Sequence, residues 1–150
     1  IILAWLTIIL NVWELRYRMA DVRINVDFDK AINPDDILRR LNNACVFLEG
    51  EVKRTLSKPG TGRAYYKGRV RHIASSPGEP PAVDTGRLRA SITHRVEREG
   101  KHFNGLVGTN VEYAKYLELG TSKIAPRPFL RPTLENNKQR ILDEFVGGGK

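Results

Sequence analysis

One run of apolar residues constrains the fold more than any other feature. Six of them recur at intervals of four and three: Ile37, Leu41, Cys45, Leu48, Val52 and Leu56. Because an α-helix has about 3.6 residues per turn, this spacing places all six side chains on one side of a helix about five turns long. Asn33 and Pro34 come just before the run, at positions where a helix favours an N-cap and a first-turn proline. The sequence therefore predicts a long amphipathic helix that buries one face.

Alternating residues predict the strands of a sheet. From Val22 to Phe28 apolar and polar residues alternate, and successive side chains of a strand point to opposite faces. Residues 91–98 and 103–109 alternate more weakly and are separated by Gly100 and Lys101. This pattern is typical of a hairpin, so we expect two further strands in the same sheet.

Two further helices complete the expected fold. Tyr113, Tyr116 and Leu117 have helical spacing, and Gly120 is placed to end that short helix in a left-handed conformation. A last amphipathic segment stops at the glycines that begin with Gly147. The sequence thus predicts an α+β domain. Its small antiparallel sheet is packed by a long N-terminal helix, a short helix and a C-terminal helix, and a long basic loop is attached.

The basic loop is the least regular part of the chain. Residues 58–85 lack periodicity and are rich in glycine and proline, which predicts a loop that is functional or becomes ordered on a partner, such as an arm reaching a neighbouring subunit. No acid lies between Val52 and Gly78. Seven basic residues do: Lys53, Arg54, Lys58, Arg63, Lys67, Arg69 and Arg71. With Tyr65 and Tyr66 among them they could line a nucleic-acid path, but a loop facing solvent or a subunit has the same pattern, and we favour that interpretation.

Composition narrows the class of protein. The chain has 150 residues, of which 41% are hydrophobic and 28% are charged, as in a soluble globular domain rather than a disordered one. Its formal net charge is +8. Such a charge favours a polyanion or an acidic protein surface as a neighbour, without deciding between them.

The first eighteen residues differ from the rest. Residues 1–13 are apolar, but a helix of that length is well short of the ~30 Å hydrocarbon core of a membrane. They also lack the basic start and small-residue cleavage site of a signal peptide. Since Met19 directly precedes the first expected strand, we expect residues 1–18 to be an upstream translated leader, with an apolar arm or anchor as the alternative. Residues 19–146 are then a single domain and residues 147–150 a glycine-rich tail.

The residue types needed for catalysis do not form a pattern. Cys45 lies on the apolar helix face, which predicts a packed and inert thiol. The three histidines lack metal-ligand spacing, and Glu112 and Glu118 lie six residues apart, about 120° off a shared helix face. We therefore predict no catalytic, cofactor-binding or metal-binding residue, no cofactor and no enzymatic activity.

Three segments remain that periodicity does not explain: residues 76–88, 113–121 and 127–132. They resemble the phage tail-component family typified by gene product 10 of phage Hong Kong 97. In that family a Pro-Gly-x-Pro-Pro loop precedes a Thr-Gly-x-Leu turn, and a Tyr-Ala…Glu-x-Gly-Thr helix end precedes a Pro-Phe-Leu-x-Pro helix start. The residues that match are Pro77, Gly78, Pro80, Pro81, Thr85, Gly86, Leu88, Tyr113, Ala114, Glu118, Gly120, Thr121, Pro128, Phe129 and Pro132.

The resemblance, which runs from about Met19 to Phe145, implies a structural morphogenesis protein of a tailed phage or prophage. Such a protein would form a homo-oligomeric ring at the head–tail joint, as a neck or tail-completion component. Its implied partners are the connector or head-completion protein, the tail tube or tail terminator protein and, non-specifically, the packaged DNA, but no membrane. It would reside in the virion neck or tail, and in the host cytoplasm before assembly. The alternative is a basic nucleic-acid-binding phage protein.

The matching residues also have a physical interpretation. Gly120 ends one helix and Pro128 precedes the next, so the connection between them should be a rigid corner that points Phe129 and Leu130 inward. Whether this corner packs only within its own domain or meets a neighbouring subunit is open at this point.

Overall fold

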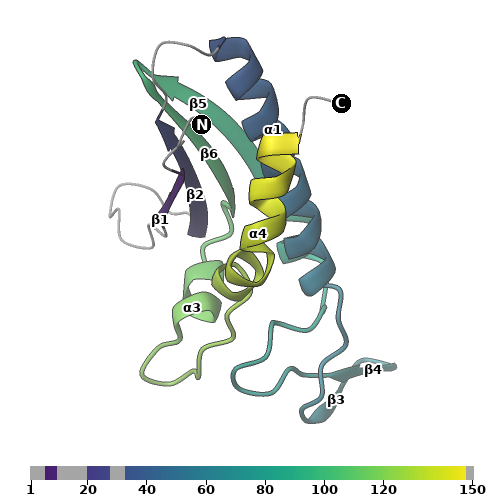
Figure 1. The fold of residues 1–150 in the computed structure, drawn as a ribbon. Coiled ribbons are helices and arrows are strands. Elements are labelled where there is room, and N and C mark those ends of the chain that lie inside the picture. The colour runs from purple at the N-terminus through teal and green to yellow at the C-terminus, as the bar shows by residue number, and fades with distance from the viewer. Residues whose placement is uncertain (1–5, 10–19, 28–32, 148–150) are drawn as a thin grey trace.

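A computed structural model describes residues 6–9, 20–27 and 33–147 (Figure 1). Its elements, in chain order, are β1 (Leu6–Ile9), β2 (Ala20–Asp27), α1 (Pro34–Thr55), β3 (Ala64–Lys67), β4 (Val70–Ile73), α2 (Arg87–Ser91), β5 (Thr93–Glu99), β6 (His102–Thr109), α3 (Ala114–Leu119) and α4 (Arg131–Gly147). Helices pack on an antiparallel sheet in this arrangement. The predicted α+β class is confirmed.

The main sheet has four antiparallel strands in the order β1-β2-β6-β5. Helix α1 crosses one face of this sheet, and α4 lies beside α1 (Figure 1). The core between them is apolar, with Val22 and Ile24 contributed by β2, Phe103 and Val107 by β6, and Ile141 by α4. We call α1, α4 and the four-stranded sheet the helix–sheet body.

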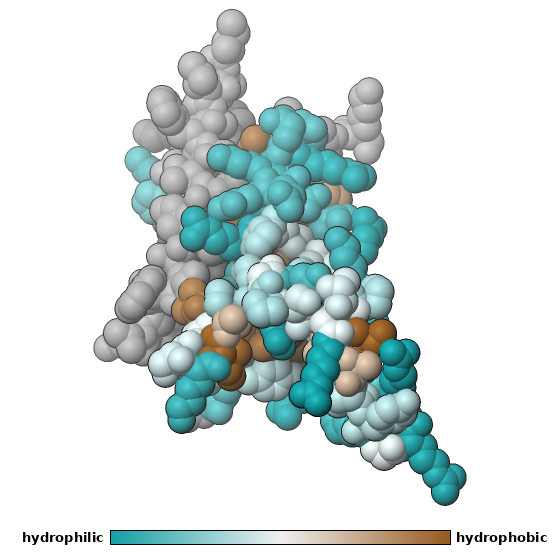
Figure 2. Space-filling model, turned by 90° about the horizontal axis from the view of Figure 1, so that it is seen from below, coloured by the Kyte–Doolittle hydropathy of each residue, from teal (hydrophilic) through white to brown (hydrophobic). Residues whose placement is uncertain are grey.

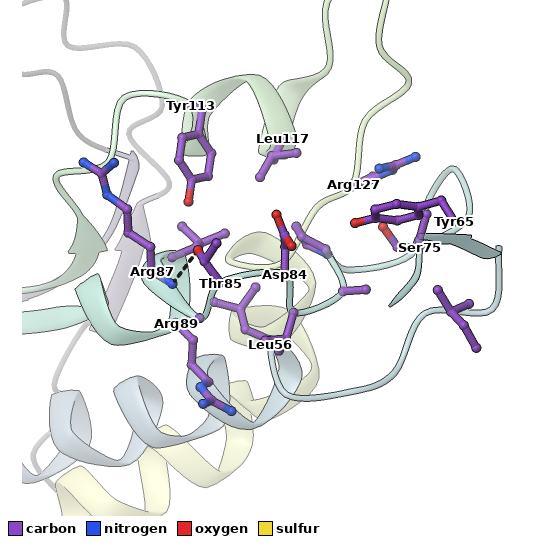
Figure 3. A pocket seen from close by; sticks show the side chains of 17 residues that line it. Leu56, Tyr65, Ser75, Asp84, Thr85, Arg87, Arg89, Tyr113, Leu117 and Arg127 are labelled. Carbon is purple, nitrogen blue, oxygen red and sulfur yellow. Dashed lines mark hydrogen bonds between the residues drawn. The ribbon is translucent and has the colours of Figure 1, made fainter. Parts of the chain in front are cut away.

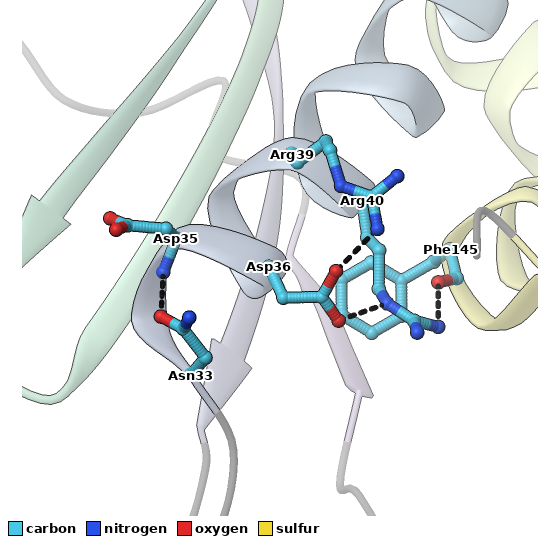
Figure 4. Close-up of polar contacts among 6 residues, drawn as sticks. All are labelled: Asn33, Asp35, Asp36, Arg39, Arg40 and Phe145. Atoms are coloured by element: carbon cyan, nitrogen blue, oxygen red, sulfur yellow. Dashed lines mark hydrogen bonds and ion pairs between the residues drawn. The ribbon is translucent and has the colours of Figure 1, made fainter.

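Helix α1 confirms the prediction made from its periodicity. All six residues of the apolar run are at most 2% exposed, and the Asn33 side chain caps the helix by accepting the Asp35 N–H at 3.0 Å. Asp36 in the first turn binds the guanidinium groups of Arg39 and Arg40, and these hydrogen bonds lower the pKa of its carboxyl group (Figure 4). Arg40 also reaches the Phe145 carbonyl oxygen at 3.5 Å, which ties the start of α1 to the end of α4.

Gly105 of β6 lets α1 pack directly on the sheet backbone. A Cβ atom added there would overlap the Sγ atom of Cys45 and lie 3.0 Å from a methyl carbon of Leu41. Burial raises the pKa of the Cys45 thiol to about 12, so that it stays protonated. The structure therefore places Cys45 in the core, as the sequence predicts.

Strand β1 departs from one expectation. It pairs with β2, in a register that sets Leu6 opposite Val26, so these four residues extend the sheet, whereas we expected none of residues 1–18 to belong to the fold. Residues 1–5 and 10–18 lie outside the described residues, as do 148–150. The boundary at Met19 and the glycine-rich tail stay predictions. In the described part of the chain, no helix is both long and apolar enough to cross a membrane.

The predicted long loop contains a second sheet, which corrects the prediction of an irregular segment. Strands β3 and β4 form an antiparallel hairpin, with Lys67 opposite Val70 and a two-residue turn at Gly68 and Arg69. Gly68 has a φ of 65° and Arg69 does not have a positive φ, a combination that suits a turn with glycine in its first central position. The two-residue Gly-x turn beside Tyr65 and Tyr66 was the sequence signal for this hairpin.

Candidate interaction site

The three family-like segments meet at one end of the molecule. Residues 76–88, α3 and residues 120–130 lie there together with the β3–β4 hairpin, at the C-terminal end of α1 (Figure 1). We call this the motif end. A pocket of about 490 Å³ opens in it (Figure 3). All three segments line this pocket, the first with Pro81, Thr85, Gly86 and Leu88, the second with Tyr113 and Leu117, and the third with Arg127.

Glu118 holds the corner between α3 and α4 in place. Its carboxylate is 6% exposed and accepts three backbone N–H groups, from Phe129 at 2.8 Å, Leu130 at 3.0 Å and Arg131 at 2.9 Å. These donors lie at the start of α4, where N–H groups lack partners within the helix and where the helix dipole favours a negative charge. Glu118 is therefore a structural cap contributed by a different helix.

Sequence reasoning included Glu118 in the family pattern but did not find this role. An acid in the last turn of α3 opposes the dipole of its own helix. That local conflict was the available signal that Glu118 has a tertiary partner. The donors could not be named from the sequence, because they follow a corner whose path depends on the fold.

Backbone hydrogen bonds define the path of the corner. The Gly120 N–H bonds to the Tyr116 carbonyl oxygen at 2.9 Å and closes α3. Its φ of 74° is positive, as expected, but its ψ of 179° differs from the predicted left-handed helical conformation. The Arg127 N–H then returns to the Leu117 carbonyl oxygen at 2.6 Å. Phe129 and Leu130 point inward and are at most 2% exposed. Intradomain packing of the corner is thus observed, and contact with a neighbouring subunit stays a prediction.

The Pro-Gly-x-Pro-Pro loop is fastened to the same corner. The Gly78 N–H bonds to the Pro126 carbonyl oxygen at 2.9 Å. The Glu79 carboxylate accepts the Thr61 hydroxyl and the Ser76 N–H, and these hydrogen bonds lower the pKa of its carboxyl group. The first segment is therefore joined by a backbone contact to Pro126, which directly precedes the third segment.

The β3–β4 hairpin forms one wall of the pocket and projects beyond it. Its inner face carries Tyr65, stacked on His72 with ring centroids 5.5 Å apart, and Lys67, whose Nζ atom lies 2.8 Å from Asp84 Oδ2. Two of its large side chains are mostly exposed: Tyr66 by 73% and Val70, which lies opposite Lys67, by 58%. Both side chains are therefore open to contact with a partner.

The seven predicted basic residues do not form a single patch. Lys53 and Arg54 belong to the last turns of α1 and pair with Glu49 and Glu51, and Lys67 pairs with Asp84. The remaining four, for which no ion pair is found among the described residues, are Lys58, Arg63, Arg69 and Arg71. The acid-free run predicted one basic patch, which is wrong because the acids that pair with its residues lie outside the run. They are Glu49 and Glu51, which precede it in α1, and Asp84, which follows it.

The pocket combines apolar walls with cations. Leu56, Leu88 and Leu117 supply apolar surface, while Arg87, Arg89 and Arg127 lie around it. Asp84 also lines the pocket, but its carboxylate is engaged by Lys67. The described residues hold no group of three or more metal-ligating side chains. The chemistry present at this site is suited to binding an anionic group that is attached to an apolar body.

Comparison with known families covers residues 76–88 and 113–120 of these segments, whereas residues 127–132 lie beyond the match. Residues 33–120, which are more than half of the chain, match the model of the family described as Bacteriophage HK97-gp10, putative tail-component. The match spans α1, the hairpin, the 76–88 loop and α3. No curated protein and no solved structure matches the chain. The chain therefore belongs to the HK97-gp10-like family of phage tail components.

Proposed function

We propose that this phage tail component works at the joint between head and tail, as one subunit of a neck or tail-completion ring. The observation that carries the proposal is the β3–β4 hairpin, which presents Tyr66 and Val70 without cover from the described chain. A two-stranded hairpin is only marginally stable by itself, so this arm is expected to gain a partner on assembly. Family membership, which makes the chain a structural part of the virion tail, supports the same conclusion.

A ring follows if the hairpin of one subunit contacts a different surface of the next. Such a head-to-tail interface repeats until its rotation closes. The ring would lie between the connector or head-completion protein and the tail tube or tail terminator protein. Its exposed arginines, Arg63, Arg69 and Arg71, would face either the lumen that DNA crosses or an acidic neighbouring ring.

Deletion of the gene tests the placement at the joint. We expect lysates with filled heads and separate or aberrant tails, because a joint protein acts after head maturation and DNA replication. Electron microscopy distinguishes this from a defect in either earlier step. Normal infectious particles from the deletion would contradict the proposal.

Charge reversal on the hairpin tests its part in joining. Replacing Arg63, Lys67, Arg69 and Arg71 with glutamate should leave the monomer folded, since exposed charges contribute little to stability, and should reduce joining of heads to tails. Because Lys67 also pairs with Asp84, the sharper pair is Arg69→Glu with Arg71→Glu, which leaves that ion pair intact. The matched control reverses Lys101 and Lys138, which are exposed elsewhere. Equal joining by both double variants would show that the hairpin charge is incidental.

Binding to nucleic acid is the second candidate function. It is favoured by the cross-strand pair of Tyr66 and Arg71 on the uncovered side of the hairpin, because an aromatic ring beside a guanidinium group is suited to stacking on bases. The test is the salt dependence of DNA binding by the isolated protein, since affinity through phosphate contacts falls steeply with salt. Salt-insensitive or undetectable binding would exclude this candidate.

A further inference from the structure

The pocket at the motif end has the size and lining of a binding site for a peptide side chain. Its volume is about 490 Å³, within the range of pockets that enclose small ligands. Figure 3 shows Tyr113 and Leu117 on one side of it and Leu56 on the other. Figure 2 looks onto this end of the domain, where brown, hydrophobic surface is exposed. Ile73, Val83 and Tyr113 line the pocket and are exposed. A large apolar side chain of a ligand could be buried here against apolar surface that is exposed to solvent in the unbound protein.

The charges around the pocket are unbalanced. Three arginines line it, and the lining acid Asp84 is already paired with Lys67. Arg89 donates to the Ser57 hydroxyl at 3.1 Å, which is a neutral partner. The pocket therefore attracts an anion.

Arg127 has an unmet hydrogen bond. Its Nε atom is shielded from solvent and has no hydrogen-bond partner among the described residues. A buried donor without an acceptor is costly. If the guanidinium group turns toward the pocket, a carboxylate bound to its Nε–Nη edge supplies the missing acceptor. The Arg127 N–H bonds to the Leu117 carbonyl oxygen, which fixes the backbone of this residue at the wall of the pocket that it lines.

We propose that this pocket binds an acidic peptide segment that carries a large apolar side chain. A carboxylate of the segment pairs with Arg127, and the apolar side chain enters the space between Leu88, Tyr113 and Leu117. The inference rests on the proposed function only in assigning the segment to a neighbouring protein of the head–tail joint.

Charge complementarity favours a different protein over a second copy of this chain. Each copy carries a formal net charge of +8, so two copies repel at a cationic site. Many of the chain's own acids are already engaged in ion pairs: Asp36, Glu49, Glu51, Asp84, Glu97 and Glu135. An acidic segment from a different protein is attracted by the positive charge, and its carboxylates are available to pair with the arginines of the pocket.

Fluorescence anisotropy with three labelled synthetic peptides tests the proposal. The first carries leucine and phenylalanine between glutamates, the second replaces its glutamates with lysines, and the third replaces its leucine and phenylalanine with glycine and serine. We expect the full-length protein to bind the first peptide most tightly, the third more weakly, and the second not at all. Arg127→Gln should weaken binding of the first peptide about tenfold. Lys138→Gln, at an exposed residue of α4 that does not line the pocket, is the matched control and should change it less than about twofold.

A second variant tests the pocket independently, in case Arg127→Gln does not fold. Val83 is exposed at the pocket, so Val83→Trp should fill the opening without disturbing the core, and it should also weaken binding about tenfold or more. Thermal unfolding confirms that each variant is folded.

Several results would overturn the proposal. They are failure of the first peptide to bind, equal binding of the lysine peptide, equal losses in Arg127→Gln and Lys138→Gln, or displacement of the peptide by double-stranded DNA. Self-association of the protein that Val83→Trp abolishes, without peptide binding, would assign the pocket to a second copy instead. If the peptide fails to bind but gene deletion still separates heads from tails, only this inference fails. If the peptide binds while the deletion yields infectious particles, the proposed function fails and the peptide site remains.

Discussion

The helix–sheet body and the motif end are built in different ways. In the body, order comes from repeated apolar positions, such as Leu41 and Leu48 of α1, that pack against β6. At the motif end, Phe129 and Leu130 also enter the core, but single polar contacts, such as those of the three N–H groups that Glu118 accepts, set the path of the chain. Packing in the body therefore depends on a repeating pattern of apolar positions, whereas the chain path at the motif end depends on particular polar residues.

This difference separates stability from function within one domain. Packing in the body tolerates exchange of one apolar residue for another of similar volume, so its sequence can vary while the fold persists. The pocket has no such freedom, because its shape depends on where Glu118 and the Gly78–Pro126 contact place three segments. We therefore expect substitutions in the body to act on folding and those at the motif end to act on assembly.

The largest effect is expected in the body. Leu48→Ala should lower the free energy of unfolding by about 3 to 5 kcal/mol, because it removes a fully buried side chain and leaves a cavity. The matched control is Val46→Ala on the other side of the same helix, where the side chain is 50% exposed, and it should cost less than about 0.5 kcal/mol. Chemical denaturation measures both. Equal losses in the two variants would contradict the burial of a single face of α1.

Glu118→Ala should have the next largest effect, about 2 to 3 kcal/mol, because three backbone N–H groups at the start of α4 lose their shared acceptor. Glu118→Gln keeps one oxygen of similar shape and should recover part of this loss. Hydrogen exchange should locate the change at residues 129–131 in both variants. If exchange instead accelerates uniformly over the body, the motif end is not a separate unit and the comparison fails.

The same difference explains what could be predicted from the sequence. The periodicity of α1, the alternation of β2 and the hairpin of β5 and β6 predicted the body, because each signal is local and repeats. The family-like motifs predicted which segments matter at the other end. They did not predict that the segments surround one pocket, since that depends on contacts such as Gly78 with Pro126, 48 residues apart in the chain.

Charge was harder to predict than packing. The acid-free run led us to expect one basic loop, whereas the structure pairs three of the seven residues with acids outside the run. Side-chain pairing across a fold has no sequence period, so a count along the chain overstates the exposed charge. The β3–β4 hairpin was missed for another reason: its strands have four residues each, too few for alternation to be distinguished from an irregular loop.

Gly105 offers a sharper test of packing in the body. Gly105→Ala should cost about 1 to 3 kcal/mol, because the new methyl group overlaps Cys45 Sγ and the neighbouring Leu41. Cys45→Ala removes the Sγ atom that the new methyl group of Gly105→Ala overlaps. The double variant should therefore be more stable than the sum of the two single losses in unfolding free energy predicts. A double-mutant cycle by chemical denaturation measures this coupling. Additive losses would show that α1 and β6 are not in direct contact at this point.

The smallest effect concerns pH, and it acts on the hairpin alone. The hydrogen bond from Lys67 lowers the pKa of the Asp84 carboxyl group below its ordinary 3.8, and the same bond raises the pKa of Lys67 above 10.5. The contribution of Asp84 is present above its ordinary value and is lost as pH falls through the lowered pKa. The contribution of Lys67 is present below its ordinary value and is lost as pH rises through the raised pKa. The pair therefore holds the hairpin against residues 81–85 throughout the neutral range.

We expect the amide NMR signals of residues 64–73 to shift when the pH falls below about 3.8. In the helix–sheet body, signals away from Asp36 and Glu49, two carboxyl groups of α1 whose pKa values are also lowered, should hold until a lower pH. Glu79 also has a lowered pKa and lies near the base of the hairpin, so a control must isolate Asp84. Asp84→Asn removes the titrating group and should abolish the shift at Lys67 and Val70 while leaving that at Thr61 and Ser76, which contact Glu79. If the variant shifts like the parent, Glu79 anchors the hairpin, and its position depends on the 76–88 loop instead of the ion pair. If the amide signals of the whole helix–sheet body are lost at the same pH as those of the hairpin, the two regions unfold together. The distinction between them then does not apply to their stability.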